Sequence, residues 1–109
     1  MNIRSMERRM QNTLKIKPTS GVSGTGSYVY GAEVTVNKCR IENGLFETVN
    51  SKGEEIKSKT HIVTFETELK ENSLITEIDG VVLPKPLKVV ADRDTPAINY
   101  NATLYECFL

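Results

Sequence analysis

The sequence predicts a mainly β protein: a small antiparallel β-barrel or sandwich of about six strands, with a short N-terminal helix or arm and a long inserted loop. Three observations favour this fold class. Strand-like segments recur at spacings near 8–15 residues, which is typical of small all-β domains. An Asp-Gly pair separates two of these segments and is a strong hairpin signal. Beyond the N-terminal segment, no stretch has the length and apolar period of a helix.

Length and charge bound the class of protein. The chain has 109 residues, with 14 basic and 14 acidic side chains, and fits a single domain, 1–109. Within it we expect an N-terminal arm (1–18) and a β-domain (28–109) with a projecting loop (44–59). The balanced charge gives no general affinity for nucleic acid or membranes. Neither an apolar run of 18 residues nor a signal-peptide core is present, so we expect no membrane partner and an intracellular site of synthesis.

The N-terminal segment carries an apolar stripe at helical spacing. The stripe consists of Ile3, Met6, Met10 and Leu14. Side chains spaced three and four residues apart share one face of a helix, so the pattern predicts a short amphipathic helix. Residues 12–17 fit a strand that ends at a proline equally well.

The same segment is basic. Residues 1–17 have a net charge of +4, and the remainder has −4. Arg4, Arg8 and Arg9 supply most of the excess and are candidate docking residues for an acidic neighbour or for nucleic acid. A solvated helix end without a partner explains the same charges.

A loop and the clearest strand come next. Residues 19–27 are rich in Gly and Ser and lack the lysine of a phosphate-binding loop, so we expect a flexible loop. Residues 28–43 alternate between apolar and polar side chains, but their apolar positions change parity near Asn37. This change predicts a bulge or bend. The apolar positions are Val34 and Val36 before the change and Cys39 and Ile41 after it.

Residues 44–59 form a polar run of 16 residues with Asn50-Ser51-Lys52-Gly53 at its centre. The run is too polar for a core, and it is longer than the usual connection of about 4–6 residues. Loops of this length in compact domains are often functional. We therefore expect it to be the working element of the protein. Its central residues are Val49, Asn50, Ser51, Lys52, Gly53, Glu54, Glu55 and Ile56.

The remaining segments complete the predicted sheet. We expect strands over residues 60–69, 74–78, 81–83, 87–91 and 97–109 and a loop over 92–96. In the first of these, His61, Val63, Phe65 and Leu69 share one parity, with Ile62 as the exception. Asp79-Gly80 predicts a tight turn. Glu106 interrupts the apolar parity of the last strand.

Catalytic chemistry has little support in the residues. His61 is the sole histidine, and Cys39 and Cys107 are the only cysteines. Both cysteines fall in strand-like segments, so we expect buried thiols, with a disulfide as the alternative. One histidine and two buried cysteines are too few ligands for a tetrahedral zinc site. The carboxylates lie on solvated segments without the contrasting environments of an acid–base pair. We expect no enzymatic activity, no metal and no cofactor.

The order of four motifs resembles the small head–tail joining proteins of tailed bacteriophages, also called head-completion, stopper or minor capsid proteins. That family has a bent strand, a polar loop with an Asx-Ser step, a Gly/Asp turn and a C-terminal strand with Glu. The corresponding motifs here are Cys39-Arg40-Ile41-Glu42, Asn50-Ser51-Lys52-Gly53, Asp79-Gly80-Val81-Val82 and Tyr105-Glu106. The resemblance covers residues 15–109. The chain lacks the Trp and the C-terminal His of the family pattern.

The resemblance implies a virion structural protein at the head–tail interface, assembled in the host cytoplasm. It implies self-association into a ring, dodecameric in the family pattern, that closes the DNA channel after packaging through loop 44–59. The implied partners are a portal or adaptor protein, a tail terminator or tail completion protein, and packaged double-stranded DNA, contacted non-specifically. Arg4, Arg8 and Arg9 would then dock the arm on a neighbouring ring or on DNA.

Two other classes of function fit the residues. One is a different connector or tail component, such as a tail terminator or tube subunit. The other is a β-barrel that binds single-stranded nucleic acid. For the latter, Tyr28 and Tyr30 would stack on bases while Lys38 and Arg40, on the same predicted strand, would neutralise phosphates.

Overall fold

The computed structural model describes residues 9–97 and 102–109. These residues form only β-structure: a seven-stranded antiparallel sheet and a separate two-stranded hairpin, with no helix among them. The strands are β1 (Asn12–Lys17), β2 (Thr19–Val22), β3 (Tyr28–Tyr30), β4 (Val34–Val49), β5 (Glu55–Thr64), β6 (Leu74–Ile78), β7 (Val81–Lys88), β8 (Ala91–Ala97) and β9 (Ala102–Phe108). The order in the large sheet is β7-β6-β1-β4-β5-β9-β8, and β2 pairs with β3.

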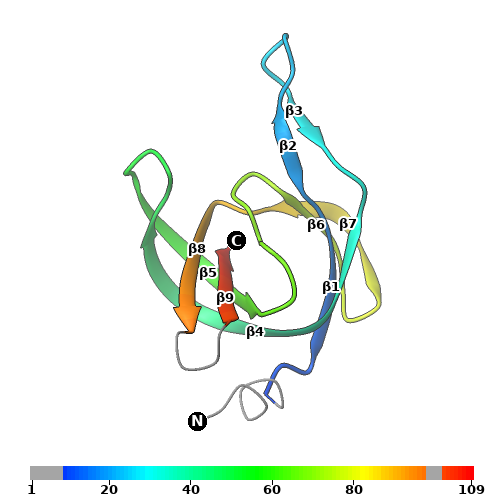
Figure 1. Cartoon of the computed structure of the whole chain (residues 1–109), viewed down its shortest axis with the longest axis vertical. Helices are drawn as coiled ribbons and strands as arrows, with labels where there is room; N and C mark the ends of the chain where they lie inside the picture. The colour runs from blue at the N-terminus through cyan, green and yellow to red at the C-terminus, as the bar shows by residue number, and fades with distance from the viewer. Residues whose placement is uncertain (1–8, 98–101) are drawn as a thin grey trace.

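The large sheet is strongly curved but open, so the prediction of a closed barrel is wrong. Figure 1 shows the sheet wrapping around an interior that the connection between β5 and β6 crosses. The two edge strands, β7 and β8, follow each other in the chain but do not pair. Pro84 and Pro86 lie in β7 and Pro96 lies in β8. Proline has no N–H to donate to a ladder, which confines it to edge strands and disfavours closure.

The core lies inside the curve of the sheet. Its members come from five strands and from the two connections that enter the curve: Leu14, Ile16, Val36, Cys39, Ile62, Leu69, Ile75, Val89 and Cys107. Leu69 belongs to the β5–β6 connection and is 0% exposed. Val89 belongs to the short link between the two edge strands. These connections fill the space that a closed barrel would fill with strand side chains alone.

The segment before Pro18 is a strand rather than the end of a helix. In β1, Leu14 and Ile16 are buried, and Lys17 is exposed. This period of two confirms the strand alternative for residues 12–17. Met10 is also buried. Ile3 and Met6, the other members of the predicted helical stripe, lie outside the described residues.

The predicted irregularity near Asn37 is confirmed. Asn12 pairs with Cys39 and Leu14 pairs with Val36, so β4 has one residue more than β1 between these two pairs. The extra residue lets both Val36 and Cys39 point into the core, where both are 0% exposed. The predicted strand 28–43 is nevertheless two strands, because residues 31–33 separate β3 from β4.

The prediction of a loop over residues 44–59 is wrong. β4 continues to Val49, β5 begins at Glu55, and Phe46 and Thr48 pair with Ser58 and Ile56 across a β-hairpin. Only residues 50–54 form the turn. One face of the distal hairpin is partly buried, but it mixes Phe46 and Ile56 with Thr48 and Ser58. Its strands therefore lack the apolar alternation by which strands are recognised.

Three further predictions have mixed outcomes. The loop predicted over 19–27 is the β2–β3 hairpin with a turn at 23–27, and the loop predicted over 92–96 lies within the edge strand β8. The turn at Asp79-Gly80 is confirmed, with φ of 50° and 82°, which are values typical of a two-residue hairpin turn. The inward face of β5 is the opposite of the predicted one: Ile62 and Thr64 are buried at 0% exposure.

Candidate functional site

The β4–β5 hairpin extends well beyond the rest of the sheet (Figure 1). β1 pairs with β4 only over Val34–Cys39, and β9 pairs with β5 only over His61–Thr64. Within the described residues, the distal parts of β4 and β5 therefore pair only with each other. Each strand presents a row of unpaired backbone N–H and C=O groups, which is the usual template for adding another strand.

Asn50 organises the turn of this hairpin. Its Oδ1 accepts hydrogen bonds from the backbone N–H groups of Lys52 and Glu54, each at 3.0 Å. Its Nδ2 donates to Glu54 Oε1 at 3.2 Å. The backbone N–H of Gly53 donates to the Asn50 carbonyl at 3.0 Å, and Gly53 has φ of 80°, a region that glycine occupies without steric cost. The turn therefore has a defined, hydrogen-bonded conformation.

A short chain of hydrogen bonds connects this turn to the body of the protein. The backbone N–H of Ser51 donates to Glu71 Oε2 at 3.1 Å, and the backbone N–H of Glu71 donates to Asp92 Oδ2 at 2.6 Å. A cleft of about 240 Å³ lies between the turn and the body, with Tyr28 and Lys88 on its far wall. Lys88 Nζ is 4.9 Å from the centre of the Tyr28 ring. Contact between hairpin tip and body is thus mainly polar.

The side chains of the hairpin have balanced charge and little apolar burial. Residues 44–59 contain three lysines and three glutamates, and Glu47 pairs with Lys57 across the ladder. Leu45 and Val49 are 77% and 54% exposed. Phe46 is the exception, since its ring centre lies 5.3 Å from that of His61 and 6.4 Å from that of Phe108. Beyond Phe46, moving the end of the hairpin relative to the body would cost little of the hydrophobic stabilisation that holds the core.

All eight central residues predicted from the sequence lie in this hairpin. Asn50, Ser51, Lys52, Gly53 and Glu54 form the turn, and the remaining three end β4 or begin β5: Val49, Glu55 and Ile56. Of the three arginines predicted to dock the N-terminal arm, Arg9 is described and exposed. Arg4 and Arg8 lie outside the described residues, so the docking role of the arm stays a prediction.

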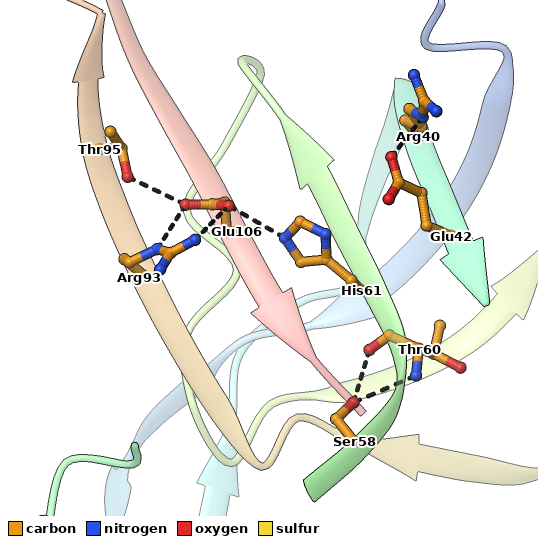
Figure 2. A network of polar contacts seen from close by, with 8 residues as sticks. All are labelled: Arg40, Glu42, Ser58, Thr60, His61, Arg93, Thr95 and Glu106. Atoms are coloured by element: carbon orange, nitrogen blue, oxygen red, sulfur yellow. Dashed lines mark hydrogen bonds and ion pairs between the residues drawn. The ribbon is translucent and has the colours of Figure 1, made fainter. Parts of the chain in front are cut away.

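A second polar site surrounds Glu106, on the face of the sheet opposite the core. Figure 2 shows its carboxylate on β9, with side chains from the two neighbouring strands, β8 and β5, pointing toward it. Arg93 donates to it through Nε at 2.8 Å and through Nη2 at 2.9 Å, and Thr95 Oγ1 donates at 3.0 Å. His61 Nε2 lies 3.0 Å from Oε1. Because a carboxylate only accepts hydrogen bonds, Nε2 is the protonated nitrogen of the imidazole.

Burial and hydrogen bonding shift the pKa of Glu106 in opposite directions. The side chain is 7% exposed, and its burial alone would raise the pKa of the carboxyl. The hydrogen bonds and charge of Arg93, with the bonds from Thr95 and His61, outweigh burial and hold the pKa below its usual value. The His61 ring also stacks on Phe108, with ring centres 4.8 Å apart. The network therefore holds a charged carboxylate in place and ties β5, β9 and β8 together.

Sequence reasoning missed this network. The signal was present, because Glu106 interrupts the apolar parity of the last strand and the chain has a single histidine. The partner Arg93 was assigned to a loop, however, so no element placed it beside Glu106. Once β8 is known to pair with β9, Arg93 stands directly opposite Glu106.

The described residues provide little for catalysis or metal binding. They contain no group of three His, Cys, Asp or Glu side chains placed to hold a metal ion. Both cysteines are free and buried. Burial, with the nearby charges of Asp79 and Glu66, raises the pKa of Cys39 to about 12, and burial also raises the pKa of Cys107. Neither thiol is a ready nucleophile.

Fold and site together define a small antiparallel β-sheet protein with two projecting hairpins. Neither the known protein-family models nor the curated protein sequences include a match to this chain. In the described part of the chain we find no helix with the length and apolar character needed to span a bilayer.

Proposed function

We propose that this protein is a structural subunit of a phage head–tail connector, a stopper that closes the DNA channel after packaging. The observation that carries the proposal is the β4–β5 hairpin, which is ordered, projects beyond the sheet and has two unpaired edges. The motif order supports the assignment to this class of protein. In this proposal the protein has no enzymatic activity and needs no cofactor.

The hairpin has the physical properties that a removable plug needs. In a ring of subunits, the unpaired edges of neighbouring hairpins can form backbone hydrogen bonds with one another. The resulting closure is reversible, because the hairpin buries little apolar surface and its turn is joined to the body through the Ser51–Glu71 bond. Balanced charge along residues 44–59 avoids strong attachment to the DNA that must later pass.

The proposed surroundings follow from the same assignment. The ring, dodecameric in the family pattern, lies at the head–tail interface of the virion. A portal or adaptor protein lies on the head side, and a tail terminator or tail completion protein docks on the other. Arg4, Arg8 and Arg9 are proposed to hold a neighbouring ring or the exiting double-stranded DNA.

The test shortens the hairpin without changing its register. Phe46 and Ser58 face each other in the ladder, so an Asn-Gly turn can replace residues 47–57 between them. Phage carrying this variant should package DNA normally and then lose it, giving empty heads in the lysate. Lys52→Ala is the matched control, because it changes an exposed side chain of the same turn and keeps the backbone N–H that bonds to Asn50.

Thermal unfolding of the shortened protein separates loss of function from loss of fold. A folded shortened variant whose heads retain DNA as well as wild type would refute the proposal. A gene located away from capsid and adaptor genes would also count against it.

Single-strand binding receives less support from the geometry. Tyr28 and Tyr30 lie in the separate β2–β3 hairpin, whereas Lys38 and Arg40 lie in the large sheet. The Arg40 guanidinium is also paired with Glu42 at 2.6 Å. Base stacking and phosphate neutralisation would thus fall on two different sheets, so we propose no second function.

A further inference from the structure

The distal part of the β4–β5 hairpin packs weakly on the body of the protein. None of residues 47–57, all of which the structure describes, is buried. The cleft of about 240 Å³ separates the hairpin turn and Ile56 from a wall of the body that includes Tyr28 and Lys88. We call residues 47–57 the strap. Its position relative to the body depends on the contacts at its base and at its tip.

The base of the strap is firmly anchored. Ser58 is 1% exposed, and its hydroxyl donates to the Leu109 carbonyl at 2.7 Å and accepts the Thr60 N–H at 3.2 Å. Figure 2 shows the Ser58 side chain bonded to Thr60. Opposite Ser58 in the ladder, Phe46 packs on two aromatic rings of the body. Buried polar and aromatic contacts of this kind are costly to break, so the base is a fixed point.

The ladder is irregular where the strap leaves the body. Asn43 pairs with Thr60 and Phe46 pairs with Ser58, so β4 has one residue more than β5 in this interval, at Gly44 or Leu45. A bulge leaves one residue unpaired and bends its strand. Beyond the bulge the ladder is regular again as far as the turn. The strap is therefore a separate ladder and does not continue the regular pairing of the sheet.

The tip of the strap is held by one carboxylate. Among the described residues, a single hydrogen bond joins the turn at 50–54 to the body, from the Ser51 N–H to Glu71 Oε2 at 3.1 Å. Ser51 is exposed and Glu71 is partly exposed, so water competes for both groups and the net gain from the bond is small. Loss of this bond would leave the tip without a hydrogen bond to the body.

The backbone that carries Glu71 is fixed independently of the strap. Residues 70–73 form a β-turn closed by a hydrogen bond of 3.1 Å between its ends. Asn72, the third residue of this turn, has φ of 71°, a conformation that asparagine tolerates. The backbone N–H of Glu71 donates to Asp92 Oδ2, and that of Asn72 donates to the Val89 carbonyl. The carboxylate is thus held ready whether or not the strap is bound to it.

We propose that the strap is latched at its tip by Glu71 and swings away from the body, about its base at Phe46 and Ser58, when this carboxylate releases the turn. The strap moves as a unit, because the hydrogen bonds of its ladder and its turn stay within it. The proposal does not rest on the proposed function, since every contact it uses lies within one subunit.

Hydrogen exchange tests the latch. Glu71→Ala removes the carboxylate and keeps the backbone N–H that donates to Asp92. We expect the Ser51 amide to exchange roughly threefold faster or more, which is the protection a single hydrogen bond supplies, while the ladder amides of the strap keep their rates. Lys70→Ala is the matched control, because it changes an exposed side chain of the same turn, and it should leave the Ser51 amide unchanged.

Spin labels on the turn and on the body test the swing. Lys52→Cys and Lys85→Cys replace two exposed side chains, and the native Cys39 and Cys107 are 0% exposed, so only the introduced thiols should take the label. The turn lies roughly 15 Å from the base, so a rotation of about 20° moves it by roughly 5 Å. We expect one narrow distance distribution with Glu71 present and a broader or second one after Glu71→Ala.

Three results would overturn the proposal. The first is a distance distribution that is the same with Glu71 and after Glu71→Ala. The second is a distribution that is already broad with Glu71 in place, because the tip would then not be latched. The third is faster exchange throughout the strap, which would mean that the hairpin unravels rather than swings. The DNA-retention test removes the strap whether or not it swings, so failure of one proposal is distinguishable from failure of the other.

Discussion

Glu106 provides the sharpest test of how this sheet is held together. Glu106→Gln keeps the size of the side chain but removes its charge and places an amide N–H₂ among donors. The carboxylate accepts four hydrogen bonds, from Arg93 twice, Thr95 and His61. Breaking a buried ion pair usually costs about 3–5 kcal/mol. The side chain of Arg93 is 60% exposed, so water can solvate it after the change, and we expect a smaller loss of about 2–3 kcal/mol.

The assay is urea unfolding at neutral pH, with thermal unfolding as a second measurement. A loss of this size should lower the thermal midpoint by roughly 10 °C for a domain of this length. Glu42→Gln is the matched control, because Glu42 pairs with Arg40 at 2.6 Å while both side chains are about 40% exposed. We expect the control to cost under about 1 kcal/mol. The reasoning is refuted if Glu106→Gln unfolds within about 0.5 kcal/mol of wild type, or if Glu42→Gln costs as much.

Three further predictions concern pH, the hairpin turn and the thiols. The pKa of Glu106 is lowered in the folded state, so its contribution to the free energy of unfolding is fully present above the usual glutamate pKa of 4.5 and is lost as pH falls below it. Urea unfolding at a series of pH values should therefore show a smaller loss of stability at acid pH for Glu106→Gln than for wild type. Asn50→Ala should speed hydrogen exchange of the two amides bound to its side chain, whereas Lys52→Ala should not, because it leaves these bonds in place; equal exchange in both would contradict the account of the turn. Cys39 and Cys107 should resist alkylation until the protein unfolds; rapid labelling of the native protein, followed by mass spectrometry, would contradict their burial.

The sequence predicted those features that depend on local alternation and turn chemistry. The parity change around Asn37 gave the bulge, because two buried residues an odd number of positions apart need an extra residue. Asp79-Gly80 gave the tight turn, because two successive residues with positive φ restrict the residue types that fit. Strand β6 was found with its correct bounds, since its neighbouring turn signals limit it on both sides.

Other features depended on pairing partners that a single sequence does not reveal. Each face of the distal β4–β5 hairpin mixes polar and apolar residues, so composition indicated a loop where the ladder continues. The edge strand β8 contains Asp92, Arg93 and Asp94, which also resemble a loop until β9 is placed beside them. The prolines of the two edge strands are visible in the sequence, but they disfavour closure of the sheet only once these strands are placed at its edges. The residues predicted as the centre of the loop form the end of the β4–β5 hairpin instead, and their role in closing a channel stays a prediction.

The pairing pattern of the sheet has a kinetic consequence. Three hairpins, β4–β5, β6–β7 and β8–β9, are local in sequence, and they are joined by β1 and by the pairing of β5 with β9. Local hairpins form in about 1–10 μs, whereas pairings between distant segments set the slow step of folding. The distal β4–β5 hairpin belongs wholly to the fast class. We therefore expect it to form before the pairings of β1 and β9 that join the hairpins into one sheet.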